Sequence, residues 1–398
     1  MAYYSIFPEK DTTLYSHPDR INMNTGKDEA LELVEEKATT GEIYYPSRIL
    51  IKFKSTDIRD VIQNKLTGVA KEVTANTIEI SLDLFTGENK SLTADHTIEI
   101  FPLSESFNEG TQRYDANPPS TTTGSFQAAN GATWVHRTNA TSSLWAHATG
   151  SMGATGSWLS NDIAIGGGIW YTGSGFRSEA TFLAEDNLDL SLDVTTIVQK
   201  YSSSFYQDAA YPTGLTNNGF IIKKLDSTEE DGFGFGELQY FSSDSHTVYP
   251  PKLTFKWDDS SYNPTVGATT LESGDIFLSL YNSKQEYQRK SKHRFRVTTR
   301  KRYPDRTFIS SSNYLDIQYL PATSYYSVRD AETNEVIIPF DTSYTKLSAD
   351  SEGMYFDLHM EGFQPERYYK LMLRSDNLEG IQIHDEDYSF KIVRYEVK

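Results

Sequence analysis

The sequence predicts an all-β protein built from two β-sandwiches in tandem. Three observations indicate this. Apolar and polar residues alternate in short segments, which is the period of a strand rather than of a helix. Aromatic residues make up 13% of the chain, with 26 Tyr and 21 Phe, and their broad faces favour half-buried sheets. The chain has 398 residues, more than the roughly 250–300 at which a single hydrophobic core stops growing.

The first predicted sandwich spans residues 1–257. Its strands are expected where alternating segments stand between turn-rich stretches. One segment places four apolar residues on a single face that should be buried: Ile78, Ile80, Leu82 and Leu84. The expected strands include residues 47–53, 77–85, 96–101, 219–224 and 252–257. One short helix is expected at residues 191–201, with Asp193 or Thr195 as its cap.

Residues 118–175 form a Ser/Gly/Thr-rich insertion that carries four Trp residues: Trp134, Trp145, Trp158 and Trp170. These rings predict long ordered loops, because burying them offsets the entropy that ordering costs. If the rings are exposed, two roles are open. They could stack on the sugars of a host surface glycan, or anchor contacts with other proteins. We favour protein contacts, because structural subunits need wide interfaces.

The second predicted sandwich spans residues 258–398 and follows a turn-rich boundary at residues 258–264. Residues 325–338 predict a β-hairpin. Two further strands, at residues 353–360 and 367–374, are joined by a Pro-containing bend that precedes a Tyr pair. This pattern is typical of an immunoglobulin-like sandwich with a tyrosine corner.

A basic segment at residues 289–303 is the most prominent charge feature. As a strand, it places Arg294, Arg296, Arg300 and Arg302 on one face and turns Phe295 inward. In a chain of formal net charge −18, this face is expected to meet acidic surfaces of a neighbouring subunit, such as another copy. The alternative is an edge strand whose charges prevent aggregation. Nucleic acid is not an expected partner, because stacking aromatic residues are not interleaved on that face.

No catalytic residue and no cofactor is predicted, so an enzyme is not expected. The chain has no Cys, which excludes disulfides and thiolate metal sites. Two acidic runs, residues 229–231 and 385–387, are interpreted as solvated charge rather than as a hydrolytic pair. A structural Ca²⁺ ion in the first sandwich stays open, although no Asp-x-Asp-x-Asp-Gly loop is present.

The ends and the apolar stretches of the chain bear on its location. The first eleven residues lack the basic start and apolar run of a secretory signal. The apolar stretches fall well short of the roughly 20 residues that span a bilayer. We therefore expect neither export by the host secretory pathway nor membrane insertion.

The first 257 residues resemble the DNRLRE family of β-sandwich domains, which is related to carbohydrate-binding modules and occurs in bacterial surface proteins and phage structural proteins. Matching segments follow the order of the family. They are residues 11–15, 24–26, 47–53, 106–110 with 131–134, 193–198, 218–222, 241–243 and 250–255. Phe107 stands where the family more often has Trp, and the insertion at 118–175 is large. Both departures put a glycan-binding face in doubt.

The resemblance implies a jelly-roll-like first sandwich. A chain without Cys or signal and with many Tyr also resembles a virion protein of a tailed marine or cyanobacterial phage. That likeness implies a non-catalytic component of the tail, neck or baseplate, made in the host cytoplasm. Its expected partners are other virion proteins and further copies of itself. The alternative is a glycan-binding adhesin of a tail fibre.

Overall fold

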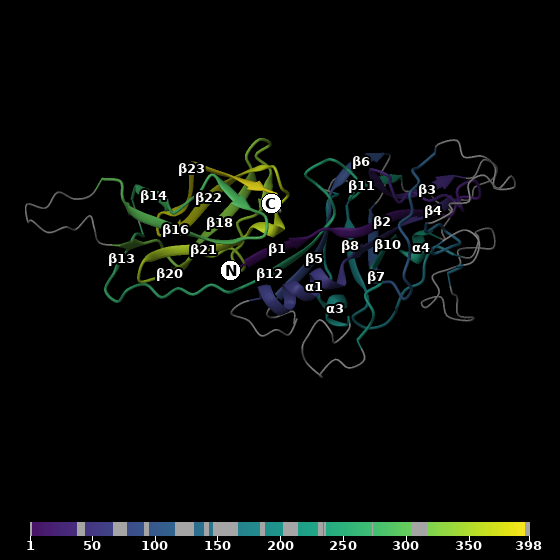
Figure 1. Cartoon of the computed structure of the whole chain (residues 1–398), viewed down its shortest axis with the longest axis horizontal. Coiled ribbons are helices and arrows are strands. Elements are labelled where there is room, and N and C mark those ends of the chain that lie inside the picture. Colours follow the sequence, from purple (N-terminus) through teal and green to yellow (C-terminus); the bar gives the residue numbers. More distant parts are fainter. Residues whose placement is uncertain are drawn as a thin grey trace, which may run out of the picture.

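The computed structural model confirms the all-β prediction, with four sheets arranged as two pairs along the chain (Figure 1). It describes residues 2–37, 44–66, 78–90, 95–115, 131–138, 143–145, 166–183, 188–201, 214–229, 234, 236–272, 274–303 and 317–394. We call the sheets formed by residues up to Trp257 the N-terminal unit, and those formed by later residues the C-terminal unit.

The N-terminal unit pairs a four-stranded sheet with an eight-stranded one. The four-stranded sheet has the order β1 (Ala2–Ile6), β12 (Lys252–Trp257), β5 (Ile78–Leu84) and β9 (Leu190–Asp193). The larger sheet has the order β6 (Thr86–Lys90), β11 (Glu237–Phe241), β3 (Ala30–Lys37), β4 (Tyr44–Phe53), β10 (Phe220–Lys224), β7 (His96–Pro102) and β8 (Ser178–Phe182), and β2 (Pro8–Tyr15) pairs with β4.

The two sheets of the N-terminal unit share one hydrophobic core. The predicted face of β5 is buried, with Ile80, Leu82 and Leu84 at 0% exposure, and it belongs to the same cluster as Ile49 and Ile100 of the larger sheet. Each strand thus contributes alternate apolar residues to the space between the sheets. The helical segments α1 (Ser55–Asp60) and η1 (Val61–Lys65) follow β4, and α4 (Asp226–Glu229) follows β10.

The helix expected at residues 191–201 is shorter than predicted. Its first part is instead strand β9, because Leu190 and Leu192 alternate into the core beside β5. Only α3 (Thr195–Gln199) is helical. The N-cap position is Val194, which makes no side-chain cap hydrogen bond, so neither Asp193 nor Thr195 is the cap. Asp193 Oδ1 instead accepts a hydrogen bond from the backbone N–H of Thr195 at 2.8 Å, which closes a local turn before the helix.

A second apolar cluster covers the other face of the eight-stranded sheet. Leu50 of β4, Ile221 of β10 and Phe101 of β7 pack there with Phe107 and Trp134 from the loops after β7. Both faces of the central strands β4, β10 and β7 are therefore buried by the chain itself. This explains why β4 and β10 read as nearly continuous apolar runs rather than as strict alternation.

The C-terminal unit pairs a six-stranded sheet with a five-stranded one. The first has the order β13 (Thr269–Thr270), β17 (Gln318–Tyr319), β16 (Lys292–Lys301), β21 (Gly353–His359) and β20 (Ser348–Asp350), and β14 (Ile276–Tyr281) also pairs with β16. The second has the order β15 (Glu286–Gln288), β23 (Gly380–Val393), β22 (Tyr368–Asn377), β18 (Ser324–Asp330) and β19 (Val336–Ile338).

Stacked aromatic rings fill the core of the C-terminal unit. Phe356 of β21 stacks on Phe295 of β16 and on Tyr326 of β18, with ring centroids 5.2 and 4.5 Å apart. The predicted hairpin is present as β18 and β19. In the bend before β22, the hydroxyl of Tyr369 donates to the backbone oxygen of Gln364 at 2.9 Å, which is the bond of a tyrosine corner.

The two units meet end to end, with strand β1 between them (Figure 1). The ring of His359, at the end of β21, lies 5.7 Å from the ring of Tyr4 and 6.2 Å from that of Trp257. Lys65 Nζ of η1 also approaches Glu361 Oε2 of the 3₁₀ turn η3 (Met360–Gly362) at 3.4 Å. We call these contacts the seam. None of the described helices has the length and apolar character that a membrane crossing requires.

Candidate functional site

Several segments that are far apart in the sequence meet around one buried side chain, Asn24, in the N-terminal unit. Its amide nitrogen donates to the backbone oxygens of Glu109 and Ala132, at 2.7 and 2.9 Å. A Cβ atom at Gly110 or Gly131 would lie only 2.0 or 2.4 Å from the Asn24 side chain. Glycine at both positions therefore permits this close packing, and we call it the Asn24 junction.

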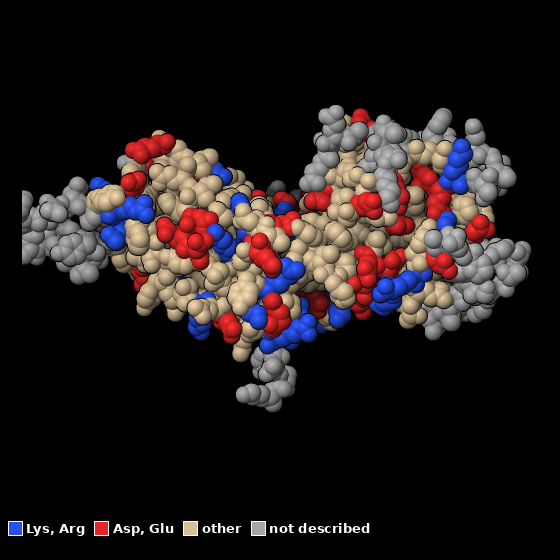
Figure 2. All heavy atoms as spheres, turned by 90° about the horizontal axis from the view of Figure 1, so that it is seen from above, with Lys and Arg blue, Asp and Glu red and all other residues tan. Residues whose placement is uncertain are grey.

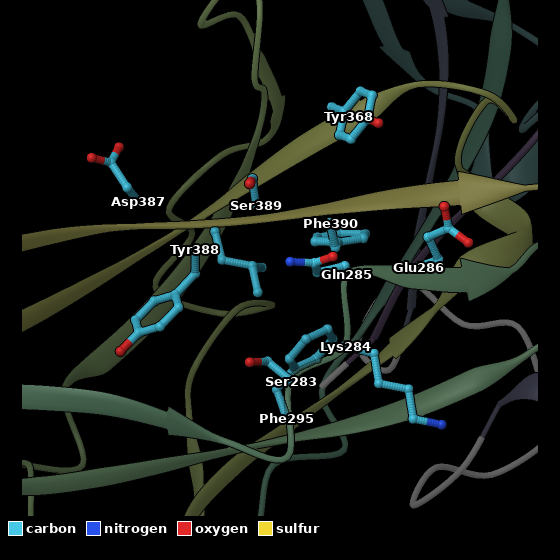
Figure 3. Close-up of a pocket in the computed structure, with 11 residues that line it drawn as sticks. Ser283, Lys284, Gln285, Glu286, Phe295, Tyr368, Asp387, Tyr388, Ser389 and Phe390 are labelled. Atoms are coloured by element: carbon cyan, nitrogen blue, oxygen red, sulfur yellow. The ribbon is translucent and has the colours of Figure 1, made fainter.

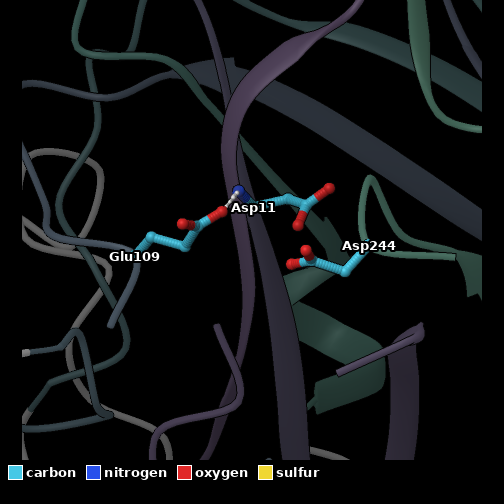
Figure 4. Close-up of side chains that lie close together, drawn as sticks. All are labelled: Asp11, Glu109 and Asp244. Atoms are coloured by element: carbon cyan, nitrogen blue, oxygen red, sulfur yellow. Dashed lines mark hydrogen bonds between the residues drawn. The ribbon is translucent and has the colours of Figure 1, made fainter. Parts of the chain in front are cut away.

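Three carboxylates lie beside the Asn24 junction: Asp11 on β2, Glu109 after β7 and Asp244 after β11 (Figure 4). One oxygen atom from each lies within 4.8 Å of the others. Asp11 is 2% exposed and accepts a hydrogen bond from the backbone N–H of Ser243 at 2.7 Å. Burial raises the pKa of Asp11 to about 7, and the nearby acidic groups add to this effect.

A lysine of the same chain already partners this carboxylate cluster. Lys27 Nζ donates to Glu109 Oε2 at 2.9 Å and to Asp244 Oδ2 at 3.2 Å. Although partial burial lowers the pKa of Lys27, these two hydrogen bonds outweigh that effect and raise it. The cluster therefore includes its own cation.

The residues present fit a calcium ion only in part. Three carboxylates are the oxygen donors that Ca²⁺ prefers, but the ion takes six to eight ligands at roughly 2.3–2.6 Å. The ammonium of Lys27 holds two of the three carboxylates. A calcium ion would have to displace that ammonium and recruit further oxygen atoms. The geometry favours a structural junction closed by Lys27.

The predicted basic face on β16 is present, but two of its four arginines are paired with carboxylates of the same chain. Arg294 binds both carboxylate oxygens of Asp357 on β21, at 2.8 and 3.1 Å. Arg296 binds both oxygens of Asp350 on β20, at 2.9 and 3.0 Å. On the face drawn in Figure 2, small groups of basic side chains lie beside acidic ones over both units. The arginines thus hold strands of one sheet together.

The remaining two arginines of this face have different surroundings. The guanidinium of Arg300 lies 4.6 Å from the ring of Phe277 on β14, whereas Arg302 follows the end of β16 and is exposed. The alternative expectation, a charged edge strand, is wrong. Strand β16 is internal, because β14 pairs with it on one side and β21 on the other.

Three of the four Trp residues of the insertion are not exposed, so these three rings do not offer the surface on which either expected role depends. Trp134, Trp145 and Trp170 are buried within the chain, at 1%, 4% and 3% exposure, and they cover the outer face of the eight-stranded sheet. Neither a sugar nor a partner protein can reach these three rings without unfolding the loops. Trp158 lies outside the described residues.

Sequence reasoning missed a buried ion pair under these rings. Arg48 of β4 donates to both carboxylate oxygens of Glu229, at 3.1 and 2.7 Å, and neither side chain is more than 1% exposed. Its guanidinium lies 4.9 Å from the ring of Trp134 and 5.1 Å from that of Trp170. The expectation of a solvated charge was therefore wrong for Glu229. A single Arg within an apolar strand is the signal that could have indicated such a pair.

A pocket of about 420 Å³ opens at one edge of the C-terminal unit, between its two sheets. Figure 3 shows Phe390 of β23 and Phe295 of β16 in its lining, with Gln285, just before β15, near them. The rings of Phe295 and Phe390 belong to the hydrophobic core. Asp387 and Tyr388 of β23 also line the pocket, so it continues along the edge of that strand.

The sequence was compared with protein-family models and with curated proteins, and no family model and no curated protein matches it. A function must therefore be argued from the arrangement of the residues described above.

Proposed function

We propose that this chain is a non-catalytic structural component of a phage virion, in the tail, neck or baseplate, and that it assembles through protein contacts. The observation that carries the proposal is the end-to-end packing of two β units around strand β1 (Figure 1). Ring contacts of Tyr4 and Trp257 with His359 hold this packing. These contacts would keep the outer ends of the two units at a fixed separation, as a subunit that connects two neighbours requires.

The side chains that could have supported chemistry or ligand binding have structural partners instead. The carboxylates beside the Asn24 junction hold Lys27, and Glu229 holds Arg48. The resemblance of residues 1–257 to a family found in phage structural proteins supports the same proposal. The expected partners are other virion proteins and further copies of this chain, in a particle assembled in the host cytoplasm.

The alternative, a glycan-binding adhesin, loses the feature on which it rested. It required exposed Trp rings in the insertion, and Trp134, Trp145 and Trp170 are buried. No other described feature favours a sugar ligand over a protein, so we do not propose this function.

Mass spectrometry of purified particles tests the proposal. We expect the amount of this protein relative to the major capsid protein to be constant across the particle fractions of a density gradient. An antibody to an exposed tag should then mark the tail, the neck or the baseplate in electron micrographs. If the protein stays with the soluble lysate and is missing from the particles, the proposal is wrong.

A further inference from the structure

Strand β23 leaves most of its outer edge without a partner strand in the part of the chain that the structure describes. It runs from Gly380 to Val393 and pairs with β22 along one side. On the other side, β15 pairs only with Lys391, Ile392 and Val393. The edge that precedes these three residues presents backbone N–H and C=O groups, which form a ready template for another strand.

The first part of this edge carries exposed apolar side chains. Ile381 and Ile383 are 63% and 57% exposed, and Leu378 in the adjoining turn is 83% exposed. A two-residue turn, Leu378 and Glu379, joins β22 to β23. In an antiparallel pair, residues that hydrogen-bond to the neighbouring strand alternate with residues whose amides face the other way. Counted from the pair that flanks this turn, Ile383 is of the second kind, so its amide points away from β22 and toward the open edge.

The middle of the edge is an acidic bulge. Leu371 and Leu373 of β22 are two residues apart, but their partners Tyr388 and His384 are four apart. Asp387, within this bulge, has a φ of 54°. The bulge thus pushes a run of three acidic residues outward: Asp385, Glu386 and Asp387.

One lysine offsets part of the charge of this bulge. Lys370 Nζ lies 2.8 Å from Asp385 Oδ2 and 2.7 Å from Asp387 Oδ1. Three carboxylates therefore face two cations, because the charge of Arg329 also acts on Asp385, and Glu386 is exposed. The middle of the edge has surplus negative charge that a basic partner would complement.

The last part of the edge opens into the pocket of about 420 Å³. Phe295 and Phe390 lie in its lining (Figure 3), and Leu371 lines it as well. All three are core residues of the C-terminal unit. An apolar side chain from a strand laid along β23 could enter this pocket and contact the core.

We propose that the open edge of β23, residues 381–390, binds an extended basic segment of a partner protein by β-strand addition. Backbone hydrogen bonds would supply affinity, and side chains would supply selectivity. Lys or Arg residues of the segment face the acidic bulge, and one apolar residue enters the pocket lined by Phe295 and Phe390. The inference rests on the proposed function, because it names how the subunit holds a neighbour.

A second copy of this chain is the less favourable occupant. Pairing two β23 edges would bring two acidic bulges together along one shared edge, and like charges close to each other destabilise paired strands. Each chain also has a formal net charge of −18. A basic segment avoids both costs.

The experiment measures fluorescence anisotropy with a labelled peptide of alternating lysine and valine, and a glutamate and valine peptide serves as the control ligand. We expect the full chain to bind the lysine peptide, more weakly as salt rises, and not to bind the glutamate peptide. Ile383→Pro removes an edge amide and should weaken binding by at least about tenfold. Ile383→Thr keeps the amide and should bind within about threefold of the unchanged protein.

A charge variant makes the test independent of any local distortion by proline. Glu386→Lys should weaken binding of the lysine peptide by about tenfold. Glu332→Lys, on an exposed turn of the same sheet, should leave the affinity for this peptide unchanged. Near-ultraviolet circular dichroism would verify that each variant is folded. The inference is wrong if the lysine peptide fails to bind, if both peptides bind equally, or if neither Ile383→Pro nor Glu386→Lys weakens binding.

Two further outcomes separate this inference from the proposed function. If the protein dimerises without any ligand and Ile383→Pro abolishes the dimer, a second copy occupies the edge, and the inference of a basic partner segment is wrong. If the protein is present in particles but the lysine peptide does not bind, the inference fails and the proposed function stands. If the peptide binds as expected but the protein is missing from particles, only the proposed function fails.

Discussion

His359 is a buried histidine whose surroundings disfavour its protonated form. Its ring contacts Tyr4 and Trp257 in the seam, and its Nε2 atom has no hydrogen-bond partner among the described residues. Burial lowers the pKa of His359 to about 4, and the positive charges of Lys292 and Lys65 contribute. Protonation of this ring should therefore destabilise the folded protein.

The sign of the pH dependence follows from the lowered pKa. The unfolded chain takes up the proton near pH 6.5, and the folded chain only near pH 4. Between these values the unfolded state binds more protons, so stability falls as pH falls through this window. The full loss is about 3 kcal/mol. Above pH 6.5 this residue has no effect.

We predict that His359→Gln removes the loss of stability that this residue contributes as pH falls from about 6.5 to about 4, because glutamine does not titrate. The measurement is urea unfolding at a series of pH values between about 4 and 7. The matched control is His246→Gln, since His246 is exposed, and it should keep the slope of the unchanged protein. Equal slopes for His359→Gln and the unchanged protein would show that His359 is not the cause.

Residues differ in how far their surroundings can be predicted from sequence. The burial of Ile80 and Leu82 follows from the local alternation of β5. The burial of Trp134 beneath a loop, and its contact with Arg48, depends on a segment more than 80 positions away. No local pattern encodes such a pair, and this is why the sequence could not show which Trp rings are buried.

Among the elements, β16 shows both the success and the limit of pattern analysis. The period of two correctly turned Phe295 inward and Arg294 outward. It could not show that Asp357 of β21 stands directly opposite Arg294 in the sheet. Burial alone would raise the pKa of Asp357, but hydrogen bonds from Arg294 and Lys292 outweigh it and lower that pKa. The cation is thus compensated within the chain.

We predict that Arg294 and Asp357 are coupled in a double-mutant cycle. The single variants Arg294→Ala and Asp357→Ala and their combination should give a coupling energy of about 0.5–1 kcal/mol, because the pair is partly exposed. The coupling should shrink at high salt. Urea unfolding measures all four proteins. Strictly additive effects would show that the pair does not stabilise the sheet.

The same pairing changes how an interface on this face must be tested. Reversing the charge of Arg294 and Arg296 would place new carboxylates beside Asp357 and Asp350. Such a variant could lose assembly merely because the C-terminal unit is destabilised. Arg302, which is exposed beyond the end of β16, is the cleaner position for a charge reversal.

At the scale of the whole molecule, the sequence predicted two all-β parts but not the seam between them. The seam joins β1 and β12, the first and last strands of the N-terminal unit, to η3 of the C-terminal unit. Its contacts unite Tyr4, Trp257, His359 and Glu361, which are scattered along the chain. Only the folded arrangement of both units brings these residues together.

Gly362 provides the last prediction, because its backbone lies close to the backbone of β1 in the seam. A Cβ atom at this position would lie 3.1 Å from the backbone nitrogen of Ser5. We predict that Gly362→Phe wedges the seam open while each unit stays folded, since Gly362 follows β21 and belongs to neither core. Small-angle X-ray scattering should show a larger maximum dimension, and calorimetry should resolve two thermal transitions in place of one.

Glu332→Phe is the matched control for this variant, because it adds the same ring to an exposed turn away from the seam. It should leave both the scattering profile and the single transition unchanged. A single transition and an unchanged dimension for Gly362→Phe would mean that the seam adjusts locally to the ring. The units would then be held together mainly by contacts other than this backbone approach, and the rigid coupling on which a connecting subunit depends would have to lie in the ring contacts of His359.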